Sequence, residues 1–445
     1  MRQFLLAFLA LIALAAPAAA EPVMMISIDG LRPGDVIEAE ARGLKLPNLR
    51  RFVSEGTYAS GVVGVLPTVT YPSHTTLITG TSPARHGITH NLAFDPLQIN
   101  NAGWTWYASD IKTQTIWEAA SRAGIKVANV HWPVSVGAKG VAWNLPQIWR
   151  TGHGDDAKLL TTLASPGLVA ELEKLTGEPY PLGIDETVEG DEARGRFAEA
   201  LIRRHKPGLI TVYLAGLDHQ QHQDGPGTPT AHAVLERLDA VVGKLVATQL
   251  ATQPDAVIAV VSDHGFLPVS KETSLYHMFI DEGLIRLDGQ GKIASWDVAL
   301  TTEDGVAMII LARPDDQALK ARVLGLIERL KADPRSGIDR IIDKSGLAKL
   351  GGDPAASLLV TFRPGTAVGD FGAAVPLYGQ TRSKGTHGYM PDEPAMQSTF
   401  MMMGRAIPRG RNLGVIDMRA IAPTLARIMG AKMAEAEKPA IAITK

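Results

Sequence analysis

Four separated segments of this chain carry aspartate and histidine side chains that are suited to hold metal ions. They are MMISIDG with Asp29, ITVYLAGLDHQQH with Asp218 and His222, AVIAVVSDHG with Asp263 and His264, and GTHGY with His387. Mixed carboxylate and imidazole ligands favour zinc, or else manganese or iron, over magnesium or calcium. Three aspartates and three histidines make two three-ligand sets, so they predict a pair of divalent ions with positions left for substrate oxygens.

The spacing within two of these segments fits metal binding. Asp218 and His222 are four residues apart, so on a helical turn both side chains would lie on one face. Asp263 and His264 follow an apolar run, and Gly265 permits the chain to turn away tightly. Each residue also has a structural alternative, as a helix cap, a turn residue or a loop histidine.

A candidate nucleophile lies in the segment PTVTYPSHTT. Thr70 precedes Pro72, a residue that favours the first turn of a helix, and the free N–H groups of such a turn attract phosphate. A threonine hydroxyl is a poor nucleophile near neutral pH unless a divalent ion activates it. The alternative is that the hydroxyls only cap the helix, and four rivals are close by: Thr68, Ser73, Thr75 and Thr76.

Apolar strand-like runs alternate with helix-period segments over the first half of the chain. We expect strands at 23–28, 127–131, 209–214 and 256–261, and helices at 115–123, 191–205 and 230–251. This alternation is typical of a parallel sheet covered by helices on both faces, whose ligands lie at the carboxyl ends of the strands. Segment 137–191 is rich in Gly, Pro and Trp and predicts loops near the mouth of the site.

Beyond residue 270 the pattern changes to short pieces and glycine-rich turns, with one βα-like unit around VAMIILARPDDQALKARVLGLIERL. We therefore expect one large core with an insertion. The expected division is a signal segment at 1–20, most of the α/β core at 21–270, an inserted α+β subdomain at 271–380, completion of the core at 381–433 and a flexible tail at 434–445.

The first twenty residues indicate export. A cationic start at Arg2, an apolar stretch and three closing alanines predict a signal peptide that is cut before Glu21, with an uncleaved anchor as the alternative. We therefore expect a periplasmic or secreted protein without stable membrane insertion. The absence of cysteine excludes disulfides and thiolate ligands. A net charge of -2, without a basic run, argues against duplex nucleic acid as a partner.

Taken in order, these segments resemble the alkaline phosphatase superfamily, and within it the nucleotide pyrophosphatase/phosphodiesterase (type I phosphodiesterase) family. The resemblance rests on ISIDGLRP, PTVTYPSHTTLITGTSPARHGITHN, TIWEAASRAGIKVANVHWP, YLAGLDHQQH, VVSDHG, GTHGYMPDEPAMQSTFMMMG and IDMRAIAPTLARIMG. It implies a three-layer α/β/α core with a mostly parallel sheet, and hydrolysis of phosphodiester or pyrophosphate bonds in nucleotides or related small molecules.

The resemblance also implies a role for each site residue. One zinc ion would be held by Asp218, His222 and His387, and the other by Asp29, Asp263 and His264. Thr70 would be the nucleophile, contact a zinc ion and carry the phosphothreonine intermediate. Asn91 would donate to a nonbridging phosphate oxygen, and Tyr71 and Tyr213 would sandwich a nucleobase.

The chain departs from the family pattern at two places. Ser73 stands where the family usually has asparagine, and Val134 stands where it often has glycine, which affects substrate selectivity rather than metal binding. The segment after the third strand has no Lys-x-Arg pair like that of one monoesterase branch, so diesters are favoured. A phosphomonoesterase or phosphonate hydrolase, and a noncatalytic metal- or ligand-binding relative, are the alternatives. The oligomeric state and the physiological substrate stay open.

Overall fold

The computed structural model describes residues 20–100, 103–148, 153–181, 185–372 and 374–443. The predicted signal segment, apart from Ala20, lies outside the described residues. Within these ranges, no helix has the length and apolarity that crossing a bilayer requires.

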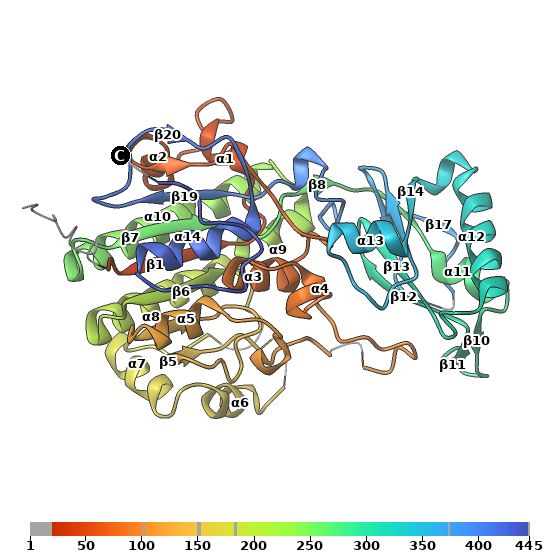
Figure 1. Cartoon of the computed structure of the whole chain (residues 1–445), viewed down its shortest axis with the longest axis horizontal. Helices are drawn as coiled ribbons and strands as arrows, with labels where there is room; N and C mark the ends of the chain where they lie inside the picture. Colours follow the sequence, from red (N-terminus) through yellow and green to blue (C-terminus); the bar gives the residue numbers. More distant parts are fainter. Residues whose placement is uncertain (1–19, 101–102, 149–152, 182–184, 373, 444–445) are drawn as a thin grey trace, which may run out of the picture.

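An eight-stranded sheet forms the centre of the larger lobe (Figure 1). In spatial order its strands are β20 (Arg411–Asn412), β2 (Thr57–Tyr58), β19 (Phe400–Met403), β7 (Val257–Val261), β1 (Val23–Ile28), β6 (Leu209–Leu214), β4 (Val127–Val130) and β5 (Val141–Leu145). The five strands from β7 to β5 are parallel, and β19 runs antiparallel to β7. The predicted strands are therefore confirmed, with shifts of at most one residue.

Helices cover both faces of this sheet because the central strands are apolar on both sides. In β1, Met24, Ile26 and Ile28 belong to one core cluster, whereas Val23 and Met25 belong to the other. The first cluster is covered by α2 (Pro47–Glu55), α7 (Leu168–Thr176), α8 (Val188–His205) and α10 (Pro229–Thr252), and the second by α3 (Thr70–Thr79), α5 (Ile116–Arg122) and α14 (Ile421–Ile428). Strands buried on both faces read as continuous apolar runs. The predicted α/β/α class is confirmed.

Segment 137–191 is more regular than predicted. It contains β5, α6 (Asp156–Leu163), α7 and the beginning of α8. Helix α7 buries Leu168, Val169 and Leu172 on one face, a helical spacing that the neighbouring glycines and prolines obscured. The prediction of loops throughout this segment is wrong.

Region 271–380 builds a second lobe, seen on the right in Figure 1. Its antiparallel sheet has the order β12 (Val298–Glu303), β13 (Val306–Leu311), β15 (Leu358–Phe362) and β14 (Ile338–Asp343). Helices α11 (Leu275–Asp281) and α12 (Gln317–Lys331) share a separate hydrophobic core with this sheet, and α13 (Lys344–Leu350) follows β14. The chain leaves the core at β8 (Leu267–Pro268) and returns at β18 (Gly385–Thr386), which pair antiparallel. We call residues 271–380 the insertion.

The C-terminal segment packs against the core. Glu437 accepts hydrogen bonds from the Ser82 N–H group at 3.1 Å and from Arg419 Nη1 at 2.7 Å. The Ile441 N–H group donates to Thr424 Oγ1 at 2.8 Å. The prediction of a flexible tail is therefore wrong for the described part of 434–445, because these hydrogen bonds hold it against the core. Its partners lie outside the segment itself, so its local sequence did not indicate them.

Candidate active site

Three aspartates lie together because their elements follow neighbouring parallel strands. Asp29 comes directly after β1 and Asp263 comes two residues after β7, and these strands are hydrogen-bonded in parallel. Asp218 lies in α9 (Gly216–Asp224), which follows β6 on the other side of β1. All three are buried. The carboxyl edge of the sheet thus carries the predicted carboxylates.

Two stacked histidines close this cluster. The rings of His264 and His387 lie 3.7 Å apart and nearly parallel, although 123 positions separate the residues in the sequence (387 − 264). His264 Nε2 lies 3.1 Å from Asp263 Oδ2 and 3.4 Å from Asp29 Oδ1, and His387 Nε2 lies 3.6 Å from Asp218 Oδ1. The β8 and β18 pairing brings His387 back to the sheet edge, so the lone loop histidine joins the site.

The predicted sixth ligand, His222, is more exposed than its neighbour Asp218, with side-chain exposures of 28% and 12%. It follows Asp218 by one turn of α9, and its Nε2 atom lies 3.4 Å from Asp218 Oδ2. Two groups have ligand atoms that all lie within 4.8 Å of one another: Asp218 with His264 and His387, and Asp29 with Asp263 and His264. The second group is one of the predicted sets. The first group contains His264 in place of the predicted His222. His264 therefore belongs to both groups.

The three histidines point the same ring nitrogen at the cluster. Each places Nδ1 against a backbone carbonyl, which fixes Nδ1 as the protonated nitrogen and leaves the Nε2 lone pair free. The pairs are His222 with Gly385 at 3.0 Å, His264 with Gly265 at 3.1 Å and His387 with Thr68 at 3.2 Å. This arrangement is typical of metal-binding imidazoles.

The electrostatics of the cluster fit divalent cations. Asp29 Oδ1, Asp218 Oδ1, Asp263 Oδ2 and His264 Nε2 are buried without a hydrogen-bond partner among the described residues. Burial and the charges of Asp263 and Asp218 raise the pKa of Asp29 well above its usual value. Buried acceptors that face one another need a compensating positive charge. The donor set, with nitrogen and oxygen atoms and no sulfur, fits zinc or a related ion.

Thr70 is the first residue of α3, a helix whose residues are all buried. The residue is 7% exposed, and no hydrogen bond among the described residues engages its hydroxyl. The rival hydroxyls are fully buried, and three of them donate to carbonyl oxygens: Thr68 to Tyr389, Thr75 to Tyr71 and Thr76 to Thr81. Ser73 is fully buried as well. Ser73 Oγ has no hydrogen-bond partner among the described residues either. Thr70 therefore differs from its four rivals in having some exposed surface.

His74 links α3, the helix that begins at Thr70, to the candidate metal ligand Asp263. The sequence analysis did not single out this histidine. His74 Nδ1 lies 2.8 Å from the Thr70 carbonyl oxygen and 3.5 Å from Asp263 Oδ2, and its Nε2 lies 2.8 Å from Ser27 Oγ. The available signal was its position four residues after Thr70, which places both on one face of a helix.

Asn91 lies beside the first turn of α3, and no hydrogen bond within the described residues engages its amide NH₂ group. Its Oδ1 atom accepts a hydrogen bond from the Tyr71 N–H group at 2.8 Å. That N–H group belongs to the first turn of α3, where helix donors lack partners within the helix. Because Oδ1 is engaged, Nδ2 remains as a donor, which suits the predicted contact with a phosphate oxygen.

Comparison with known proteins agrees with this architecture. The family model for type I phosphodiesterase / nucleotide pyrophosphatase matches residues 23–390. The chain belongs to this family. The segments that carry the candidate ligands, Thr70 and Asn91 all fall within the match, and the family predicted from the motifs is confirmed.

Two curated relatives show how far the chain has diverged in sequence from known members of the family. An uncharacterised pyrophosphatase/phosphodiesterase of Schizosaccharomyces pombe is 26% identical over 56% of this chain and 45% of its own length. Human ectonucleotide pyrophosphatase/phosphodiesterase family member 1 is 26% identical over 57% of this chain and 24% of its own length. The match thus spans less than half of either relative.

The solved structures of murine ectonucleotide pyrophosphatase/phosphodiesterase 5 share the fold. One has a TM-score of 0.66 at 18% identity and covers 95% of this chain and 97% of its own. An inactive threonine-to-alanine variant of the same murine protein in complex with AMP has the same TM-score, identity and coverage.

The two tyrosines expected to sandwich a base have other positions. Tyr71 and Tyr213 are fully buried. The Tyr213 hydroxyl donates to Asp29 Oδ2 at 2.6 Å, and the Tyr71 ring packs against Trp104 with ring centres 5.4 Å apart. A ring without exposed surface presents no face to a nucleobase, so the stacking prediction does not hold for these rings as the structure places them.

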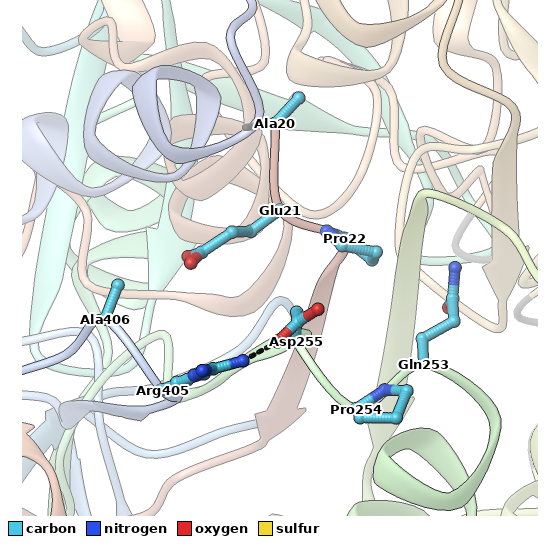
Figure 2. A pocket seen from close by; sticks show the side chains of 8 residues that line it. All are labelled: Ala20, Glu21, Pro22, Gln253, Pro254, Asp255, Arg405 and Ala406. Atoms are coloured by element: carbon cyan, nitrogen blue, oxygen red, sulfur yellow. Dashed lines mark hydrogen bonds and ion pairs between the residues drawn. The ribbon is translucent and has the colours of Figure 1, made fainter. Parts of the chain in front are cut away.

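Two cavities lie on different sides of the molecule. Figure 2 shows one of about 560 Å³, lined by residues such as Pro22 and Asp255 that precede β1 and β7, so it is at the opposite end of these strands from Asp29 and Asp263. The other, of about 540 Å³, is lined by Asn91 and by Glu303 of the insertion. Only the second adjoins a predicted site residue.

Proposed function

We propose that this chain is an exported two-zinc hydrolase of phosphodiester or pyrophosphate bonds in nucleotides or related small molecules. In the proposed division, Asp218, His222 and His387 hold one ion, and Asp29, Asp263 and His264 hold the other. Thr70 lies between the two sets as the covalent nucleophile. The predicted signal segment supports export to the periplasm or the medium.

One observation carries the proposal. Buried ligand atoms without a hydrogen-bond partner among the described residues, from the segments after β1 and β7 and from the first turn of α9, meet His387, which follows β18. They lie beside α3, whose first residue is Thr70. A purely structural cluster would satisfy its buried polar atoms internally. The family membership of the chain supports the same conclusion.

The chemistry assigned to the protein residues has two displacements. The hydroxyl proton of Thr70 passes to solvent, and Thr70 Oγ forms a bond to phosphorus while the bond to the leaving-group oxygen breaks and that oxygen departs with the electron pair. Water then attacks the phosphothreonine, and the bond between phosphorus and Thr70 Oγ breaks as the hydroxyl is restored. Two divalent ions, when bound, would supply the positive charge that favours ionised oxygen nucleophiles and leaving groups.

Asn91 Nδ2 would donate to a nonbridging oxygen, whose charge is stabilised in both displacements. The N-terminal end of α3, where Thr70 lies, favours the phosphate at the same position. The murine relative that was inactivated by a threonine-to-alanine change and bound AMP supports both a reacting threonine and a nucleotide ligand for this chain.

Rates on a nitrophenyl nucleotide diester and on nitrophenyl phosphate, measured with zinc-loaded protein, test the proposal. We expect the higher kcat/KM for the diester. Faster monoester turnover would replace the proposed activity with a phosphomonoesterase, and turnover of neither substrate nor of a phosphonate ester would favour a noncatalytic relative. Thr70→Ala serves as the matched control for background hydrolysis.

A further inference from the structure

His90 joins the core to the insertion through two carboxylates. It is 4% exposed, with its Nε2 atom 2.9 Å from Asp353 Oδ2 and its Nδ1 atom 3.3 Å from Glu303 Oε1. Glu303 ends β12, and Asp353 follows α13. The imidazole comes from the segment after α4 (Pro83–His86), whereas both carboxylates come from the insertion. Two ring N–H groups facing two carboxylates is the geometry of a protonated imidazole.

The surrounding charges favour that protonated state. Although burial disfavours a charged ring, the hydrogen bond to Asp353 and the nearby carboxylate of Glu303 raise the pKa of His90 to about 9. Asp110 and Lys112 also line the cavity of about 420 Å³ that His90 and Asp353 border, and their opposite charges offset each other. At neutral pH the cluster therefore holds one imidazolium between the buried carboxylate of Asp353 and the half-buried carboxylate of Glu303.

The same cluster holds the main chain of Asn91. The Asn91 N–H group points at Glu303 Oε1 at 3.4 Å, the oxygen that faces His90 Nδ1. The Asn91 side chain is held from the other side by the Tyr71 N–H group of α3. Asn91 is thus fixed at its backbone by the insertion and at its amide oxygen by the nucleophile helix.

We propose that His90 is a positioning residue, whose imidazolium holds Glu303 and Asp353 against the core and thereby aims the Asn91 amide at the reacting phosphate. The inference rests on the proposed function, because it needs Asn91 as a phosphate donor. It goes beyond that function because it gives the insertion, through Glu303 and Asp353, a part in orienting the Asn91 amide.

Loss of the His90 proton should release this alignment. A neutral ring would leave one nitrogen lone pair facing a carboxylate. It would also leave the Asp353 and Glu303 carboxylates without a cation between them, which is unfavourable away from solvent. The donor on Asn91 stabilises charge in the transition state, so its displacement should lower kcat and change KM little. Activity should therefore fall as pH rises through the titration of His90.

A double-mutant cycle on the full, zinc-loaded chain tests whether His90 acts through Asn91. We expect Asn91→Ala to lower kcat on the nitrophenyl nucleotide diester by about 100-fold, as for loss of an oxyanion donor. His90→Gln should lower kcat by about 10-fold with KM within about 2-fold, and the double variant should match Asn91→Ala, because residues that act as a unit are not additive.

The inference would be overturned if His90→Gln lowered kcat by the same factor in the unmutated chain and in the Asn91→Ala chain. Full kcat of His90→Gln would also overturn it. If Asn91→Ala itself retained full kcat, the donor role in the proposed function would fail, and the inference would fall with it. Asp297→Asn is the matched control, because Asp297 pairs with Arg286 at 2.7 Å within the insertion and away from His90. It should leave kcat unchanged.

The pH profile supplies a readout that does not depend on a folded His90 variant. In the unmutated chain, kcat should fall at alkaline pH with an apparent pKa near 9, which we call the alkaline limb of the profile. Asn91→Ala, from which the donor is already missing, should lack this limb. Glu303→Gln keeps an acceptor for the Asn91 N–H group but removes one charge, so it should move the limb to lower pH. Identical profiles for the unmutated chain and Asn91→Ala would contradict the proposed role.

Discussion

The Tyr213 hydroxyl donates a hydrogen bond to Asp29 Oδ2 at 2.6 Å, across the neighbouring strands β6 and β1. This bond engages one carboxylate oxygen and leaves Asp29 Oδ1 facing His264 Nε2 at 3.4 Å. A buried phenol thus orients a candidate metal ligand, which is a different role from the base stacking expected from the sequence.

Tyr213→Phe should weaken metal binding. Removing a partner that orients a ligand typically costs about 10- to 100-fold in metal affinity. Chelator competition would measure this change, and turnover at saturating zinc should be largely restored. Tyr389→Phe is the matched control, since its buried hydroxyl donates to the Thr366 carbonyl oxygen in the insertion at 3.0 Å. Equal zinc affinity of the Tyr213 variant and the unmutated chain would contradict the orienting role.

Thr70→Ala should keep both metal ions but reduce kcat by about 1000-fold or more, because the covalent route is lost. Metal analysis and steady-state rates on the nitrophenyl nucleotide diester check the two halves of this prediction. Thr75→Ala, one turn along the same helix, removes a hydroxyl that only bonds Tyr71 and should be active once folded. Undiminished turnover in Thr70→Ala would refute the nucleophile assignment.

Metal stoichiometry should separate the two ligand groups. Asp218→Ala should lose about one of two ions per chain, because the second group keeps all its ligands. His264→Ala should reduce both, because its Nε2 atom is in reach of both groups. Elemental analysis after dialysis would report the ratios, with His205→Ala as a control at a histidine that pairs with Glu171 instead. Unchanged zinc in Asp218→Ala would count against the proposed division.

The His90 cluster should also make stability depend on pH. A histidine whose folded pKa is raised stabilises the fold fully below its unfolded pKa, near 6.5, and this contribution is lost as pH rises towards about 9. The shift corresponds to roughly 3 kcal/mol at most. Urea unfolding of the unmutated chain and His90→Gln should therefore differ most at acidic and neutral pH and converge above about pH 9. A difference that is independent of pH would argue against a charged His90.

Removal of residues 434–445 should destabilise the core without changing the chemistry. Glu437 accepts from Ser82 and Arg419, and charge-assisted hydrogen bonds of this kind contribute about 1 to 3 kcal/mol each. The unfolding midpoint in urea should fall while kcat/KM stays the same. Glu282→Gln, which breaks an exposed pair with Arg322, should leave the midpoint nearly unchanged. A truncated chain with the original midpoint would show that the segment adds nothing to stability.

The sequence by itself determined four central strands of the sheet and the candidate metal ligands. The runs VMMISI and LITVYL are apolar without interruption, so local composition sufficed to predict β1 and β6 with their observed bounds. Asp29 and Asp263 follow such runs directly, and parallel strands bring their ends to one edge of the sheet. The predicted helix start drew attention to Thr70 and four rival hydroxyls, and the family resemblance selected Thr70 among them.

Only the tertiary structure decided which of these groups meet and what holds them. The stacking of His264 on His387, the bond from Tyr213 to Asp29 and the ion pairs of His90 with Glu303 and Asp353 join segments that are far apart in the chain. Local spacing does not encode such contacts, because they depend on which strands pair in the core and on how the insertion leaves and re-enters it. The helices in 137–191 and the packing of Glu437 were missed for the same reason: their stabilisation comes from burial and partners that a local pattern does not contain.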